Sequence, residues 1–264
     1  MTAATLARIL HHERVLPVVA VALVAALAWA YLLAGAGTMQ DMDGMLMPMS
    51  AGPWTAAHAL IMLCMWVVMM VAMMLPSALP MILLHATIAR RNTAAGGPGP
   101  AVALFALGYL AVWSLFSIAA VALQYLLERA ALLSPMMETT SIVLAGGTLI
   151  AAGVYQWTPV KSACLAHCQS PLDFVLAHWR SGRLGALRMG IRHGAYCVGC
   201  CWALMLLLFV GGVMNLAWIV GLAVYVLVEK LTPAGHWISR ATGVVFVAWG
   251  VATLLAPYLA LNLA

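Results

Sequence analysis

Very few residues of this chain carry charge. Asp, Glu, Lys and Arg together make up 7% of its 264 residues, whereas hydrophobic residues make up 66%. This composition excludes an ordinary soluble domain and predicts a membrane protein with several spans. The sequence contains no evident P-loop or phosphorylatable-aspartate motif, so nothing indicates transport driven by a nucleotide. The net charge of +5 follows from membrane topology, and no nucleic-acid-binding surface is indicated.

Apolar runs long enough to cross a bilayer, about 20 residues each, recur along the chain. We predict an all-α bundle of about seven transmembrane helices, near residues 15–36, 56–86, 101–127, 141–158, 194–211, 213–229 and 240–262. Only the turn residues Gly211, Gly212 and Asn215 separate the fifth run from the sixth, so one long broken span is the alternative there. The whole chain, residues 1–264, is expected to form a single integral membrane domain.

The basic residues predict the orientation. With seven spans and a cytoplasmic N-terminus, all but one of the 12 Lys and Arg residues fall in cytoplasmic segments, as the positive-inside rule requires. The exception is Arg129. Basic residues precede the first run, which ends in small residues, so residues 1–36 are either a retained span or a cleaved signal segment. The retained span is preferred because the apolar run is longer than a usual signal core.

We expect the few polar residues inside the runs, or just after them, to have structural roles. Lys161 is expected at the level of the cytoplasmic headgroups. Glu229 and Lys230 end the sixth run and are expected to anchor it there, with an inward-turned Glu229 as the alternative. Gln124 is expected to bond to another helix. The spacing of Gly190 and Gly194 permits a close helix contact, and the oligomeric state stays open.

The stretch 62–81 is uncharged and rich in methionine. Met69 and Met73 are four residues apart and share one face of a helix, and Met74 lies beside them. Thioethers are soft ligands that suit Cu(I), although methionine also fills gaps in apolar cores. We predict that these three residues contact metal at mid-membrane depth, with packing as the alternative. His58 and His85, near the two ends of this run, are weaker ligand candidates.

The segment 38–53 is expected to be a methionine-rich loop on the outer face. Its methionines alternate with Asp, Gly and Pro, which disfavour a packed helix. Short methionine spacings let a mobile chain wrap two or three thioethers around one soft ion, and the aspartates attract a cation. The predicted ligands in this loop are Met39, Met42 and Met45. The alternative is a low-complexity loop that dips into the headgroups.

Five of the six cysteines lie in two motifs near the cytoplasmic boundary, where thiols stay reduced. Residues 159–193 are expected to form a cytoplasmic segment that carries the first motif and a basic amphipathic helix over 171–192. The second motif begins the fifth run, where every fourth residue shares a helix face. The predicted metal ligands in the two motifs are Cys164, His167, Cys168, Cys197, Cys200, Cys201 and Met205.

These motifs resemble those of a bacterial domain-of-unknown-function family described as predicted metal-binding integral membrane proteins. The resemblance covers roughly residues 39 to 231, and the cysteine block is its most specific part. It implies a multi-pass protein of the bacterial inner membrane that handles metal. The residues that carry it are Trp66, Met69, Ala72, Met73, Met74, Pro76, Pro80, Tyr155, Gln156, Lys161, Cys164, Cys168, Pro171, Cys197, Val198, Gly199, Cys200, Cys201, Trp202, Met205, Gly212, Met214, Asn215, Glu229 and Lys230.

The sequence therefore favours a Cu(I)-binding membrane protein that is not an enzyme. It would transport copper, or deliver it to a copper chaperone or a membrane cuproenzyme. Zinc is the alternative metal, because Cys3His sites are typical of structural zinc. One alternative function is thiol–disulfide exchange by the pairs Cys164/Cys168 and Cys197/Cys200. Another is a non-catalytic assembly subunit whose sulfur atoms only pack the core.

Overall fold

The fold comes from a computed structural model of the chain. It describes the backbone of residues 3–36, 39–42, 45–48, 54–91 and 99–263, and the side chains of residues 15–36, 54–90 and 99–257. The long helices are α1 (Ala3–Leu33), α2 (Ala56–Arg91), α3 (Gly99–Arg129), α7 (Gly182–Leu206) and α10 (Gly235–Leu263). The shorter ones are α4 (Ile142–Tyr155), α5 (Pro159–Gln169), α6 (Pro171–His178), α8 (Leu208–Gly211) and α9 (Leu216–Leu231).

Five helices in the described part of the chain are long and apolar enough to cross a membrane. The qualifying stretches are Val15–Leu33, Ala56–Arg90, Gly99–Arg129, Gly182–Gly211 and Gly235–Pro257. The all-α prediction is thus confirmed for the main elements, and these stretches indicate a multi-pass membrane protein.

The expected number of seven such helices is wrong. The fourth and sixth predicted spans do form helices, but α4 has only 14 residues and α9 only 16. At about 1.5 Å per residue, each is shorter than the roughly 30 Å hydrocarbon core. Helix α4 stops early because Thr158 caps the next helix, α5, and Pro159 occupies its first turn. Helix α9 begins only after Asn215, whose side chain accepts from the Trp218 backbone N–H.

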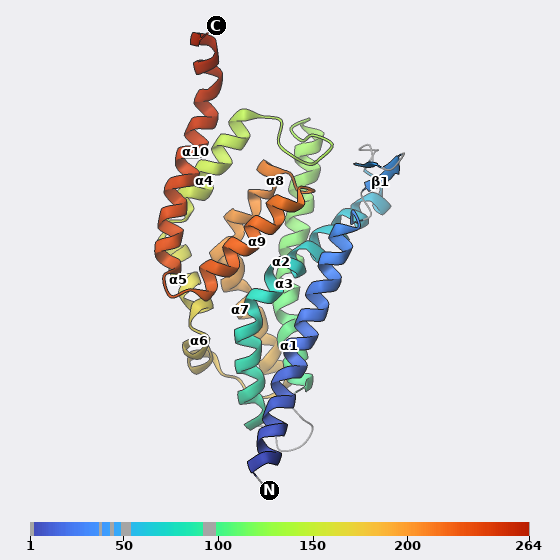
Figure 1. Cartoon of the computed structure of the whole chain (residues 1–264), viewed down its shortest axis with the longest axis vertical. Coiled ribbons are helices and arrows are strands. Elements are labelled where there is room, and N and C mark those ends of the chain that lie inside the picture. The colour runs from blue at the N-terminus through green and yellow to red at the C-terminus, as the bar shows by residue number, and fades with distance from the viewer. Residues whose placement is uncertain (1–2, 37–38, 43–44, 49–53, 92–98, 264) are drawn as a thin grey trace.

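The helices form an elongated bundle with the two chain ends at opposite ends of the molecule (Figure 1). Helix α3 packs along both α7 and α2, while α1 covers α2 and α10 pairs with α4. Helix α5 packs on α7, and α9 packs on α2. Helices α2 and α7 thus share α3 as a neighbour, and the space between them is filled by their side chains.

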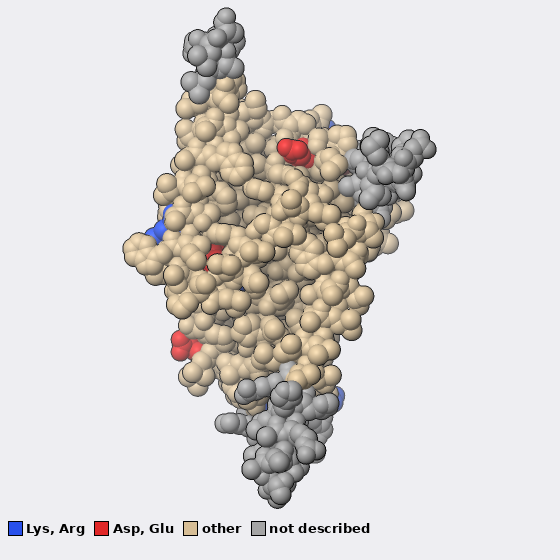
Figure 2. All heavy atoms as spheres, in the orientation of Figure 1, with Lys and Arg blue, Asp and Glu red and all other residues tan. Residues whose placement is uncertain are grey.

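Residues other than Lys, Arg, Asp and Glu cover almost all of the described part of the face that Figure 2 shows. Large apolar side chains stand exposed on the long helices, as expected of surfaces that face lipid rather than water. They include Leu23, Leu27, Leu60, Leu115 and Val244. The interior, in contrast, contains polar groups that bond across helices. The Trp66 indole N–H donates to the Gln124 side-chain oxygen at 2.8 Å, which confirms the bonding role predicted for Gln124.

The amphipathic helix expected in the cytoplasmic segment is not observed as predicted. Residues 171–192 do not form one amphipathic helix, because α6 ends at His178 and α7 begins at Gly182. Gly182 has a φ of +82°, a left-handed conformation that a continuous helix cannot accommodate. Helix α7 then runs without a break from this turn through the second cysteine motif.

Glycines bring α3 and α7 together. A Cβ added at Gly190 would collide with the backbone carbonyl of Phe105, and one added at Gly108 would collide with the Leu187 carbonyl oxygen. Gly194 likewise faces α3, since its Cβ would lie 3.1 Å from the Tyr109 carbonyl oxygen. The close contact that the spacing of Gly190 and Gly194 permits is therefore made within one chain.

A side chain at Gly190 should destabilise this packing. We expect Gly190→Ala to lower the free energy of unfolding by about 1–3 kcal/mol, because the α3 backbone must move away from the new methyl group. Gly221→Ala in α9 is the matched control, since its Cβ would meet no atom within 4 Å. Thermal unfolding of both variants in detergent measures the difference. Equal melting temperatures for the two variants would contradict the packing argument.

Candidate metal centre

Sulfur atoms of α7 form a buried stripe that faces the interior. Cys197, Cys201 and Met205 follow one another at four-residue intervals, and their exposed fractions are 1%, 0% and 0%. Four-residue spacing keeps side chains on one face of a helix. Helix α3 packs along α7, and the hydroxyl of its Tyr109 lies 3.1 Å from the Cys197 sulfur. The common face predicted for these three residues is confirmed.

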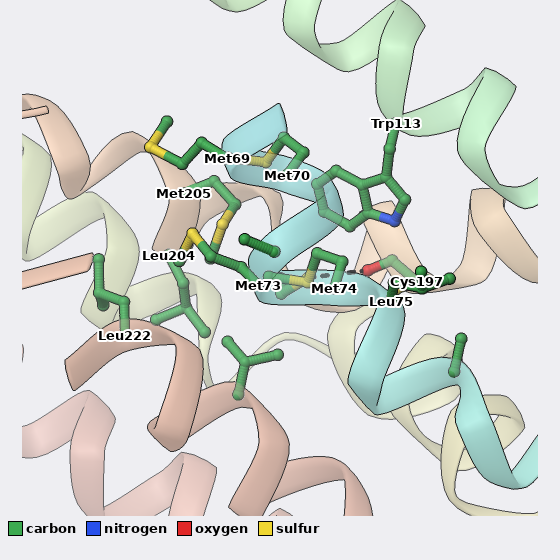
Figure 3. Close-up of a cluster of buried hydrophobic side chains, with 14 of the residues drawn as sticks. Met69, Met70, Met73, Met74, Leu75, Trp113, Cys197, Leu204, Met205 and Leu222 are labelled. Atoms are coloured by element: carbon green, nitrogen blue, oxygen red, sulfur yellow. Dashed lines mark hydrogen bonds between the residues drawn. The ribbon is translucent and has the colours of Figure 1, made fainter. Parts of the chain in front are cut away.

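The methionines of α2 occupy the same interior. Met69, Met73 and Met74 are each 0–2% exposed, and Figure 3 shows them in the core with Met205 of α7. One contact joins the two helices directly, because the Cys201 Sγ lies 4.0 Å from the Met74 Sδ. The structure therefore brings a thiol and a thioether from distant parts of the sequence to the same point.

The Cys197 sulfur has a polar environment unlike that of a packed cysteine. The Lys230 ammonium donates to the Cys197 Sγ at 2.9 Å, and the Tyr109 hydroxyl lies 3.1 Å from the same sulfur. Lys230 also contacts the Ser77 hydroxyl at 3.3 Å and the Met74 Sδ at 3.8 Å. Since Lys230 is only 4% exposed, its positive charge acts on these sulfurs with little screening by water.

The first cysteine motif lies on α5, which packs against α7. Gly199 of α7 leaves room for Cys164, since an added Cβ would lie 2.7 Å from the Cys164 Sγ. Burial and the nearby Cys200 raise the pKa of Cys164. Hydrogen bonds to Cys197 and Cys200, together with burial, raise the pKa of Cys168 well above its ordinary value. Both thiols therefore keep their protons at neutral pH and must release them to bind a metal.

A buried ion pair fixes α5 to the end of α9. The Lys161 ammonium lies 2.8 Å and 2.9 Å from the two Glu229 carboxylate oxygens, and it donates to the Cys200 carbonyl oxygen at 3.0 Å. Tyr225 and Ser239 also donate to this carboxylate. Lys161 and Glu229 are 1% and 0% exposed, so the ion pair and its hydrogen bonds hold the cysteine-bearing part of α7 in place.

The predicted ligands separate into groups. Cys201 meets Met74 directly, and the thiols of Cys168, Cys200 and Cys201 adjoin Cys197. The predicted metal role of all these residues stays a prediction. The side chains of Met39, Met42 and Met45 lie outside the described residues; only their backbone is described, in the hairpin of β1 (Met39–Met42) and β2 (Met45–Pro48).

His167 is directed to other partners. Its ring stacks on Tyr196 with centroids 4.1 Å apart, and its Nδ1 lies 2.8 Å from the Ala163 carbonyl oxygen. Among the described residues, no three His, Cys, Asp or Glu side chains are grouped so as to hold a metal ion. The donors that do meet are thiol and thioether sulfurs, a set that suits a soft monovalent ion better than zinc.

Sequence reasoning missed the charged part of the site. Lys161, Glu229 and Lys230 were assigned to the headgroups, yet all three are buried beside the cysteines. The alternative of an inward-turned Glu229 is the arrangement observed. The available signal was the charge itself, because an ionisable residue within an apolar helix usually faces a functional interior. Tyr109 carries no comparable signal in the sequence.

The comparison with protein families gives one match. The model of the PpoB2 family, described as a copper chaperone, matches residues 63–253, which is most of the chain. The chain belongs to the PpoB2 copper chaperone family. Comparison with curated proteins and with solved structures finds no match. The matched region contains α3, α5, α7, α9 and most of α2, which are the helices that contribute to the candidate metal centre.

Membership of the PpoB2 family implies that copper is the metal handled. This agrees with the resemblance found in the sequence, since both descriptions concern metal, and it favours copper over zinc. The donor set is chemically suitable, because thiol and thioether sulfurs meet between α2 and α7.

Neutralising one partner of the buried ion pair should destabilise the fold. Glu229→Gln is expected to lower the free energy of unfolding by about 3–5 kcal/mol, because it leaves the Lys161 ammonium buried without an anion. Replacing both residues, as Lys161→Met with Glu229→Gln, should recover much of this loss. Glu138→Gln is the control, since Glu138 is exposed. Chemical denaturation measures the free energy of unfolding of each variant. A lower value for the double variant than for Glu229→Gln would contradict the pairing.

Proposed function

We propose that this chain binds Cu(I) between α2 and α7 and hands it on to a cuproenzyme. The observation that carries the proposal is the contact of the Cys201 Sγ with the Met74 Sδ across the interior, where the Lys230 ammonium touches both the Met74 and the Cys197 sulfurs. Thiolate and thioether sulfurs select Cu(I) over hard cations such as Mg²⁺ and Ca²⁺. Membership of a copper chaperone family supports both the metal and its delivery. No chemical conversion of a substrate is required.

The Lys230 ammonium compensates the negative charge of the copper-loaded site. Cu(I) bound by two thiolates has one net negative charge, which is unfavourable in a dry interior unless a cation lies close by. The Lys230 ammonium already lies 2.9 Å from the Cys197 sulfur and 3.8 Å from the Met74 sulfur. It therefore stabilises the thiolate form that binds metal and compensates the charge of the loaded site.

A graded series of sulfur ligands provides a path for the ion. Under this proposal the methionines of segment 38–53 capture copper at the outer face, and Met69 and Met73 receive it. The buried cysteines bind it more strongly, because thiolates are stronger ligands than thioethers. Cys164 and Cys168, which are half-buried on α5, then present the ion at the cytoplasmic side. Each step exchanges ligands at Cu(I), so no nucleotide is needed.

The proposed orientation places the N-terminus and segment 159–193 in the cytoplasm of a bacterium, with the protein in the inner membrane. The distribution of Lys and Arg supports this direction. Helices α4 and α9, each shorter than the hydrocarbon core, lie against longer neighbours, α10 and α2. Re-entrant or shortened helices are tolerated in membranes where protein rather than lipid surrounds them.

Copper binding by purified protein tests the proposal. The protein in detergent is titrated with Cu(I) under anaerobic conditions, and bound copper is measured by elemental analysis. We expect near-stoichiometric copper in the wild type and its loss in Cys197→Ser with Cys201→Ser. Cys64→Ser is the matched control, because Cys64 is exposed on α2 and should leave binding intact. Wild-type protein that binds no copper, and instead forms a reversible disulfide between inner cysteines, would contradict the proposal.

Removing the charge of Lys230 should weaken copper binding. Lys230→Met keeps a long side chain but removes the ammonium, so the thiolate form and the anionic copper complex lose their counter-charge. We expect the affinity for Cu(I) to fall at least tenfold, about 1.4 kcal/mol, in a competition assay with a chelator. Lys230→Arg should retain more affinity than Lys230→Met because it keeps the charge. Equal affinities for wild type and Lys230→Met would refute this role.

A further inference from the structure

Two buried histidines take no part in the centre described so far. His85 on α2 is 2% exposed and His193 on α7 is 3% exposed. Both ring nitrogens of His85 and the Nδ1 of His193 have no hydrogen-bond partner among the described residues. A buried polar group without a partner costs about 1–3 kcal/mol, and such groups in native structures call for an explanation.

The surroundings of the two rings are aromatic. Phe105 contacts both imidazoles, with ring centroids 4.8 Å from His85 and 6.0 Å from His193. Trp179 adds a contact with His85 at 5.6 Å, and Phe174 one with His193 at 5.4 Å. Tyr109 also stacks on His193, with centroids 5.7 Å apart, and none of these neighbours bonds to the three unpartnered nitrogens. A neutral imidazole in such a place is available as a ligand for a soft or borderline metal ion.

His193 also extends the sulfur stripe of α7. It lies four residues before Cys197, and Met189 lies four residues before it, so all share one helix face. Met189 is 1% exposed and lines a cavity of about 290 Å³ whose other lining residues are His178, Arg180, Arg188 and Arg192. The stripe of potential copper ligands thus runs from Met205 through the cysteines and His193 to the wall of a cavity.

Helix α2 repeats this pattern in the same region. Met81 lies four residues before His85, as Met189 lies four residues before His193, and Met81 is 1% exposed. Each helix therefore carries a methionine and a histidine on one buried face. Phe105 of α3 contacts the histidine of both pairs. Two separate elements bring the same two ligand types to one neighbourhood.

We propose that His193 and His85 form a second copper-binding step, which connects the cysteine centre with the cavity beside Met189. This inference rests on the proposed Cu(I) function and extends it. Cu(I) leaves the Cys197 thiolate for the imidazole nitrogen of His193 by ligand exchange, with no change of oxidation state. A neutral imidazole binds Cu(I) less tightly than a thiolate does, so this step releases copper at the expense of affinity and requires an acceptor at the cavity.

Copper K-edge X-ray absorption on Cu(I)-saturated protein tests the inference. Imidazole ligands give a characteristic outer-shell scattering that thiolate and thioether ligands lack. We expect this signature in the wild type at saturation, together with sulfur scattering. His85→Leu with His193→Leu should remove the imidazole signature and the additional copper ion that saturation loads beyond the near-stoichiometric sulfur site, while sulfur-bound copper stays. His236→Leu is the matched control, because His236 is exposed.

The possible results separate this inference from the proposed function. Sulfur-only copper in the wild type at saturation would overturn the histidine step and leave the cysteine centre intact. An unchanged copper content in the double histidine variant would do the same. Protein that binds no copper at all would overturn both. Removing unpartnered buried nitrogens should not lower the melting temperature of the metal-free protein, and a large loss of stability would indicate a structural role for the histidines instead.

Discussion

The contact between the Lys230 ammonium and the Cys197 sulfur, at 2.9 Å in the interior of the bundle, is the interaction on which the candidate centre depends. A charge in such a place has little water to solvate it and needs a polar or anionic partner. The neighbouring carboxylate, that of Glu229, is already paired with Lys161. Lys230 is left with sulfur and hydroxyl groups, and this makes the cysteine group electrically suited to an anionic metal complex.

The helices around this contact are arranged so that it can form. Glycines on α3 and α7 allow their backbones to approach closely, which fixes the stripe of α7 against a rigid neighbour. Helix α2 packs on another part of α3, so its methionines reach α7 through their long side chains. Methionine is suited to this role because it is flexible and its sulfur is polarizable. The metal centre therefore occupies a space that α3 defines.

Much of this arrangement could be predicted from sequence. Hydrophobicity and length identified every long apolar helix, and four-residue spacing placed Cys197, Cys201 and Met205 on one face. The span count failed at α4 and α9 because composition does not reveal where a cap ends a helix. The prediction that Lys230 lies at the headgroups failed for a related reason. Local sequence suggested a headgroup anchor, but the direction of the side chain depends on helix packing that brings α9 beside α2.

The central claim is that copper binds to sulfur between α2 and α7. Anomalous diffraction at the copper edge, from crystals of the copper-loaded protein, tests it most directly. The account predicts an anomalous peak within bonding distance of the sulfurs of Cys201 and Met74, close to Cys197. A loaded protein whose copper peaks all lie elsewhere, such as on segment 38–53 alone, would contradict it.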